Sequence, residues 1–252
     1  MIESAVTLET KCWQGDWKRL LTTNHLEVLA ERNAFAFTER VLMINNVDDY
    51  TEVVRHADRA VARGWISRYV VVKDHIDEAL RFFELTPDAL GRGYVYSAAE
   101  FVSIFVCRTP LLLHYASDCL PAERYDWVPK ALHLLGRDPR VKVANLTWDH
   151  KYEEARDESS EETEDFYIGY GFSDQCWLVR IDDFRAPIYN HTHEASARYP
   201  DYGGDLFEKR VDAWMRSVGA LRATYKRGSY IHQRRPAPTR WERWRRRLAG
   251  GA

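Results

Sequence analysis

The sequence lacks any apolar run that approaches the ~20 residues a helix needs to cross a bilayer. Its first residues, Met1-Ile2-Glu3, also lack the basic and apolar regions of a secretory signal peptide. We therefore expect a cytoplasmic protein. The formal net charge is only −2 over 252 residues. So small a charge gives no electrostatic basis for bulk nucleic-acid binding, and we expect no nucleic-acid partner.

Cysteine is also scarce. The four cysteines (Cys12, Cys107, Cys119 and Cys176) form no CxxC pair and no zinc-type spacing. We expect buried free thiols rather than a metal centre built from cysteine. What the chain does contain is ordinary for a globular protein: 45% hydrophobic and 29% charged residues. At this length it can form one large α/β domain or two small ones.

Strand and helix signals alternate from residue 40 onward. Residues 40–47 predict a first strand, and residues 66–74 a second, β-branched one that ends on a carboxylate. The helix between them has Asp48 or Asp49 as N-cap and ends at Gly64. A further helix is expected over residues 77–84. This order is typical of a parallel sheet with right-handed crossovers.

The segment 93–121 organises the rest of the chain. It predicts a helix over residues 97–107 and then a short strand, Leu111-Leu112-Leu113, buried on both faces. Asp118 follows this strand closely. Open α/β sheets bind ligands in the crevice outside the carboxyl ends of their strands, so Asp118 is the first candidate site residue.

The second half continues the pattern with a helix over 127–135, a strand over 141–146, a helix over 206–215 and a final strand over 225–232. Between them, residues 150–165 are strongly acidic. Such a run is typical of a solvated loop or helix face, and a lid over a site is the alternative.

The triplet Ser173-Asp174-Gln175 lies between apolar neighbours on both sides. An acidic residue in such surroundings tends to have a raised pKa and suits an acid/base role. Asp174 is equally well placed to cap a helix that follows it.

The two ends of the chain differ from the middle. Residues 1–39 have apolar residues at helical spacing over 11–21 and 25–32, and we expect a helical N-terminal extension packed on the core. Residues 233–252 form a basic tail with Trp241, Trp244 and Leu248 at helical spacing. A basic amphipathic helix can bind an anionic membrane surface, and a frayed terminus is the alternative.

In this order, the strand ending in Asn45-Asn46-Val47, the strand ending in Val72-Lys73-Asp74 and the unit from Ser97 to Asp118 resemble the GT-A fold of nucleotide-sugar glycosyltransferases, in particular the family 2-like group. The resemblance covers about residues 40–232. It implies a single α/β domain with a Rossmann-like, mostly parallel sheet flanked by helices. Residues 40–121 would form the nucleotide-binding half and residues 122–232 the acceptor half.

Individual motifs of the family have partial counterparts here. In the family an Asp after the second strand contacts the nucleotide base, and Asp74 stands at that place. Ser97-Ala98-Ala99-Glu100-Phe101 corresponds to a helix motif A-x-N-x-G, and Ala116-Ser117-Asp118 to the metal-binding DxD with its first carboxylate replaced by Ala. The resemblance thus assigns the donor site to Asn45, Asn46, Val47, Asp74, Ser97, Glu100, Ser117 and Asp118.

The same resemblance implies the chemistry. Ser173-Asp174 corresponds to an acidic "ED" pair whose Asp is the base toward the acceptor hydroxyl, and single in-line displacement would invert the anomeric centre. A divalent cation, Mg²⁺ or Mn²⁺, would be held by Asp118 and a late histidine, His232, with His191 and His193 as further candidates. In a metal-free alternative, Arg198 or Lys226 and Arg227 would neutralise the phosphates.

We therefore expect a glycosyltransferase that moves a sugar from a nucleotide-sugar donor to a glycan or glycolipid acceptor. The family resemblance adds a setting in bacterial surface polysaccharide synthesis at the inner face of the plasma membrane. A catalytically silent binding module with the same fold is one alternative. A nucleotidyltransferase is another, although the chain lacks a Gly-rich phosphate loop at Asn45-Asn46-Val47-Asp48-Asp49. The first expectation requires Asp118 and Asp174 to share one cleft.

Overall fold

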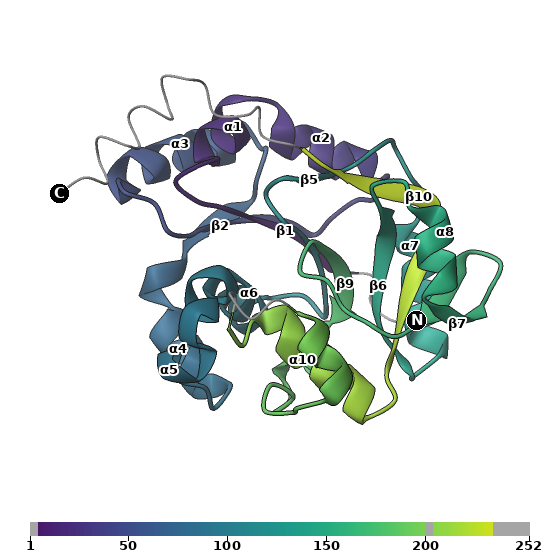
Figure 1. Ribbon diagram of the computed structural model, residues 1–252. Coiled ribbons are helices and arrows are strands. Elements are labelled where there is room, and N and C mark those ends of the chain that lie inside the picture. Colours follow the sequence, from purple (N-terminus) through teal and green to yellow (C-terminus); the bar gives the residue numbers. More distant parts are fainter. Residues whose placement is uncertain (1–4, 200–203, 234–252) are drawn as a thin grey trace, which may run out of the picture.

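The computed structural model describes residues 5–199 and 204–233, and it is built around one ten-stranded sheet (Figure 1). The strands follow the order β3-β2-β1-β4-β9-β6-β10-β8-β7, and β5 pairs with β10 outside this path. Their bounds are β1 (Val6–Cys12), β2 (Glu39–Ile44), β3 (Arg68–Val71), β4 (Leu111–Tyr115), β5 (Cys119–Pro121), β6 (Val141–Trp148), β7 (Ser159–Glu162), β8 (Phe166–Gly169), β9 (Cys176–Arg180) and β10 (Leu221–His232).

Helices cover both faces of the sheet. They are α1 (Trp17–Thr22), α2 (His25–Arg32), α3 (Tyr50–Ala62), α4 (Ile76–Phe82), α5 (Pro87–Leu90), α6 (Tyr94–Val106), α7 (Val128–Arg137), α8 (Tyr152–Asp157), α9 (Ile181–Arg185) and α10 (Phe207–Ser217), with 3₁₀ turns η1 (Val72–Asp74), η2 (Gly91–Gly93) and η3 (Glu194–Arg198).

The core therefore has two layers, one on each side of the sheet. In β2, Val41 and Met43 pack into the layer beneath α4, α6 and α10, whereas Leu42 and Ile44 pack against α1 and α3. Figure 1 shows these two groups of helices on opposite sides of β1 and β2. Successive strand residues point to opposite faces, so a strand buried on both sides is a continuous apolar run. This is why the strand signals of residues 40–47 and 111–113 predicted β2 and β4 correctly.

The expected helical extension over residues 1–39 is wrong for residues 6–12. This segment is β1, and it lies in the middle of the sheet, parallel to both β2 and β4. The apolar pattern failed here because β1 carries Glu9 and Lys11 at positions that face the protein interior rather than solvent. The helical prediction is right for α1 and α2 only, and residues 5–39 are part of the domain rather than an extension of it.

Pairing changes from parallel to mixed along the sheet. β3, β2, β1 and β4 are parallel neighbours, β9 runs antiparallel between β4 and β6, and β10 is parallel to β6. The segment after Asp174 is thus a strand, β9, and the alternative in which Asp174 caps a helix is wrong. A short apolar run such as residues 176–179 fits a buried helix and a buried strand equally well, so periodicity did not separate them.

Local helix signals were predicted correctly. The Asp49 side chain accepts a hydrogen bond from the Glu52 N–H and caps α3, which ends before Gly64 in the left-handed region at φ 71°. The acidic segment 150–165 contains α8 and β7, and its Glu161 and Glu162 form ion pairs with Arg140 and Lys226.

Within the described residues, no helix has the length and apolar character needed to span a membrane. The basic tail, residues 234–252, lies outside the described residues, and its amphipathic helix stays a prediction.

Leu8 offers a test of the central position of β1, because its side chain is buried. Leu8→Ala should lower the free energy of unfolding by about 2–5 kcal/mol through lost burial and a residual cavity. The control Val218→Ala removes a side chain that is 54% exposed and should change it by less than about 0.5 kcal/mol. Chemical denaturation of both variants measures the difference. Equal, small effects would contradict a buried β1.

Candidate functional site

A cleft of about 660 Å³ opens at the carboxyl ends of β1, β2 and β4. This is the edge of an open α/β sheet where ligands are expected. The lining residues are Lys11, Cys12, Trp13, Gln14, Asn45, Asn46, Val95, Tyr96, Ala116, Ser117, Asp118, Asp174 and Gln175. We call this space the main cleft.

Asp118 and Asp174 both line the main cleft, so the expectation that they share it is confirmed. Their meeting follows from strand direction. Asp118 lies just after β4 and Asp174 just before β9, and antiparallel neighbours place the end of one beside the start of the other. The Ala116 N–H donates to the Gln175 carbonyl at 2.8 Å and joins the two loops directly.

The loop that carries Asp118 is held from several sides. The Ser117 hydroxyl donates to the Asp16 carboxylate, and Arg19 donates to the Ser117 carbonyl at 2.6 Å. The Gln233 N–H donates to the Asp118 carbonyl, also at 2.6 Å. The Ser117 side chain therefore positions the loop, which leaves the partly buried Asp118 carboxylate as the charged group this loop presents to the main cleft.

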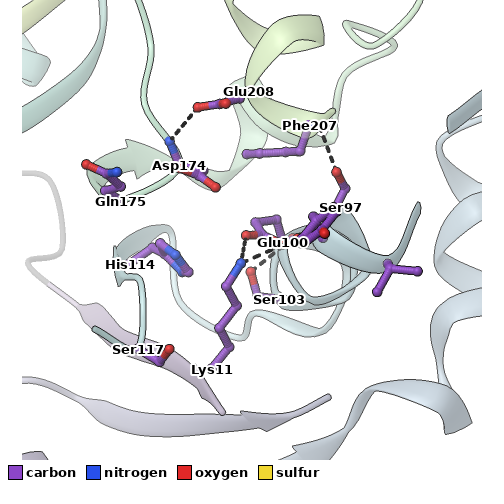
Figure 2. Close-up of polar contacts among 12 residues, drawn as sticks. Lys11, Ser97, Glu100, Ser103, His114, Ser117, Asp174, Gln175, Phe207 and Glu208 are labelled. Atoms are coloured by element: carbon purple, nitrogen blue, oxygen red, sulfur yellow. Dashed lines mark hydrogen bonds and ion pairs between the residues drawn. The ribbon is translucent and has the colours of Figure 1, made fainter. Parts of the chain in front are cut away.

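The floor of the main cleft is a buried charge network. Lys11 forms an ion pair with Glu100 of α6, and Figure 2 shows its side chain reaching from β1 to that helix. Burial alone would lower the pKa of the Lys11 ammonium, but the charges of Glu100, Asp174 and Glu9 outweigh it and raise the pKa. The Glu100 carboxylate therefore binds Lys11 and does not line the main cleft. It can influence a donor only through the Lys11 side chain.

Glu208 of α10 lies beside Asp174. The Asp174 N–H donates to the Glu208 carboxylate at 3.5 Å (Figure 2). Burial, with the nearby charge of Asp174, raises the pKa of Glu208 to about 8. Glu208 therefore keeps its proton at neutral pH and can donate a hydrogen bond rather than act as a base.

Aromatic and amide side chains form the rim. Trp13 is 40% and Tyr96 58% exposed. The Asn46 amide donates to the Val95 carbonyl at 2.9 Å and links the loop after β2 to α6 across the main cleft. A β-carbon at Gly15 would lie 2.7 Å from the Trp13 ring. Only glycine at this position leaves enough space for the indole in the observed orientation.

Three of the predicted donor-site residues lie elsewhere. Asp74 is exposed at the end of η1, and Val47 packs in the core beside α3. The Ser97 hydroxyl is buried and accepts the Phe207 N–H at 2.9 Å at the start of α10. The sequence analysis did not recognise β1 as a strand, so its strand numbers are too low by one. Asp74 follows the third strand of the sheet, and Asn45 and Asn46 follow the second.

The histidines predicted as metal ligands do not line the main cleft. His232 bonds Asp149 through Nδ1 at 2.8 Å. His191 and His193 line a separate cavity of about 470 Å³ beside α10. Over residues 5–199 and 204–233, no group of three or more His, Cys, Asp and Glu side chains is placed to hold a metal ion.

The cations of the metal-free alternative also lie away from the main cleft. Lys226 pairs with Glu162, and Arg227 pairs with Asp165. Arg198 lines a second cavity on the other side of the Ser173–Gln175 segment.

Lys11, Trp13, Gln14, Tyr96 and Glu208 were not predicted as site residues. A strand assignment for residues 6–12 would have found the first three, because they follow or end that strand. The β-branched residues Val6, Thr7 and Thr10 were the available signal. No sequence pattern could have identified Glu208, because its raised pKa depends on the approach of α10 to Asp174 in the folded protein.

The raised pKa of Glu208 predicts a pH dependence of stability. The folded protein keeps a proton that the unfolded chain releases near pH 4.5. This contribution is therefore complete below that pH and is lost as the pH rises toward 8, with a slope of at most about 1.4 kcal/mol per pH unit. Glu208→Gln cannot ionise and should flatten the slope, while Glu123→Gln, at an exposed position, should keep it. Denaturant titrations from pH 5 to 8 measure this. Identical slopes in all three proteins would contradict the prediction.

No family model matches the sequence, and no curated protein matches it. Solved structures do. Glucosyl-3-phosphoglycerate synthase from Mycobacterium tuberculosis, solved with Mn²⁺, UDP and phosphoglyceric acid, is similar at 12% identity over 92% of this chain and 72% of its own, with a TM-score of 0.50. Mouse xyloside xylosyltransferase 1 matches at 15% identity over 85% of this chain and 82% of its own, with a TM-score of 0.45.

At such low identity the likeness to the synthase concerns the backbone. The shared backbone arrangement covers 92% of this chain, in which a parallel half and a mixed half form one sheet with helices on both faces. The expected GT-A-like α/β fold is thereby confirmed.

Proposed function

We propose that the protein is a glycosyltransferase that takes a nucleotide-sugar donor into the main cleft. The observation that carries this proposal is the meeting of Asp118 and Asp174 at the carboxyl edge of the sheet. A fold shared with a synthase that was solved with UDP supports it. The reaction needs a leaving-group site and a base on opposite sides of one sugar. In this proposal Asp118 belongs to the leaving-group site and Asp174 is the base, and both line the main cleft.

In this proposal the donor nucleotide lies toward the β1–β2 side. Trp13 and Tyr96 offer exposed aromatic faces for a base, and Asn45 and Asn46 offer amide groups. This arrangement replaces the role that the sequence assigned to Asp74. The diphosphate then lies toward Asp118, the carboxylate that follows β4.

A divalent cation fits this site in a restricted way. Mg²⁺ keeps several waters and needs one or two protein carboxylates beside the phosphates of its ligand, and Asp118 supplies one. With Ala116 where the family has a carboxylate, the phosphates and waters must complete the shell. When bound, Mg²⁺ or Mn²⁺ neutralises the charge that develops on the leaving diphosphate.

Asp174 acts as the base in this proposal. It takes the proton of the acceptor hydroxyl as that oxygen attacks the anomeric carbon, and single displacement inverts the configuration. Protonated Glu208 donates rather than competes, so Asp174 is the carboxylate left to accept the proton. The acceptor is a glycan or glycolipid in surface polysaccharide synthesis, as the sequence resemblance suggested. The basic tail, residues 234–252, binds the membrane, as its amphipathic pattern suggested.

A panel of UDP-, GDP-, dTDP- and CMP-sugars with and without Mn²⁺ tests donor binding by thermal shift. One donor should raise the melting temperature, with a stabilisation of about 2.7 kcal/mol at 100 Kd. Asp118→Ala should weaken the Mn²⁺-dependent part of this binding. Asp126→Asn changes an exposed aspartate and serves as control. Absence of any donor effect would contradict the proposal.

With the donor identified, Asp174→Asn should lower the transfer rate by about 10²-fold or more while donor affinity stays within a factor of about two. Transfer assays with radiolabelled donor measure both. Unchanged turnover would remove Asp174 from the mechanism. Donor binding without transfer to any acceptor by the wild type would favour the silent module, for which the substitution by Ala116 is the supporting observation.

A further inference from the structure

A second cavity of about 340 Å³ adjoins the main cleft. Gln175 lines both, and the Ser173–Gln175 segment runs between them, so Asp174 faces one space while its N–H bonds Glu208 in the other. The lining residues are Trp148, Glu154, Glu158, Phe172, Ser173, Gln175, Arg198, Tyr199, Glu208, Arg222 and Tyr230. We call this space the arginine cavity.

Arg222 is the most unusual residue of the arginine cavity. It is only 6% exposed, and its Nη2 donates to Glu158 at 2.9 Å while its guanidinium lies 5.3 Å from the Trp148 ring centroid. Its Nε–H has no acceptor among the described residues. A buried guanidinium donor without an acceptor is costly, and Arg222 is one of the side chains that line this cavity.

Arg198 and Arg222 approach the same side of Gly171. A β-carbon at Gly171 would lie 2.9 Å from Arg198 Nη2 and 3.2 Å from Arg222 Nη1. Gly171 has φ 112°, a conformation that favours glycine, and its lack of a side chain leaves room for the two guanidinium groups. Two guanidinium groups thus converge on one wall.

Arg198 has no carboxylate partner of its own in this region. Arg198 and Arg216 share the buried Asp212 carboxylate, and Arg222 is paired with Glu158. Glu154, which also lines the cavity, is paired with Lys151. Arg198 is therefore the guanidinium group of this cavity that can best bind a further anion.

We propose that the arginine cavity binds the acceptor and that this acceptor carries an anionic group, a carboxylate or a phosphate, held by Arg198 and Arg222. The inference rests on the proposed function, since it treats the hydroxyl presented to Asp174 as the attacking group. Trp148 and Tyr199 supply aromatic surface for a sugar ring around this anion. An anion anchored beyond the Ser173–Gln175 segment would orient the ring toward the main cleft.

Three matched sugars test this directly: glucose, glucuronate and glucose 6-phosphate. Isothermal titration at fixed ionic strength should show the anionic sugars binding the full-length protein at least about tenfold more tightly than glucose, since hydrogen bonds to charged groups are the strong ones. The better of the two anions tells whether a carboxylate or a phosphate is preferred. Equal affinity for all three sugars would overturn the proposal.

Variants locate the anion. Arg198 is exposed at the rim, so Arg198→Gln should fold and should weaken anionic-sugar binding about tenfold while leaving glucose binding unchanged. Arg198→Lys should restore part of the loss. Arg55→Gln removes the same charge at an exposed position on α3 and should have no effect. Equal effects of Arg198→Gln and Arg55→Gln would overturn the assignment to this cavity.

Donor binding to the same variants separates this inference from the proposed function. Nucleotide-sugar affinity should be the same in wild type and Arg198→Gln, because Arg198 does not line the main cleft. A protein that binds a donor but shows no preference for anionic sugars would contradict the inference alone. A protein that binds anionic sugars through Arg198 but no donor would contradict the proposed function and leave an anion-binding cavity.

Discussion

One buried ion pair and one buried hydrogen bond allow a strand with charged residues to occupy the centre of the sheet. Lys11 pairs with Glu100 of α6. The Glu9 carboxylate is hydrogen-bonded to Nδ1 of His114 in β4, whose ring stacks on Trp177 with 4.7 Å between the ring centroids. A buried ion pair contributes little net stability, but the loss of one partner is strongly destabilising. The Lys11–Glu100 pair therefore specifies how β1 and α6 fit together more than it stabilises the fold.

The functional geometry follows from this arrangement. With β1 between β2 and β4, the loops after three parallel strands open at one edge, and antiparallel β9 returns Asp174 to the same edge. α10 then brings Glu208 against Asp174 from the opposite side. The Ser173–Gln175 segment then lies between the main cleft and the arginine cavity, and Gln175 lines both, so the two spaces adjoin beside Asp174.

The sequence predicted those parts whose burial is visible in the apolar pattern. β2, β4 and α3 were recognised this way, and Asp118 was identified because it follows a buried strand. β1 was missed because Glu9 and Lys11 have their partners, His114 and Glu100, far along the chain. That error moved the strand count and with it the role given to Asp74. The arginine cavity was also unpredictable, since it needs β10, η3 and the loop before β9 to meet.

A double-mutant cycle on Lys11 and Glu100 tests this dependence most directly. Lys11→Met leaves the Glu100 carboxylate buried without its partner and should lower the free energy of unfolding by about 3–5 kcal/mol. Glu100→Leu should cost less, because Lys11 lines the main cleft and can be hydrated there. The double variant removes both charges and should cost clearly less than the sum of the two. Single effects that add to within about 0.5 kcal/mol would show that the two side chains do not interact and would contradict the account.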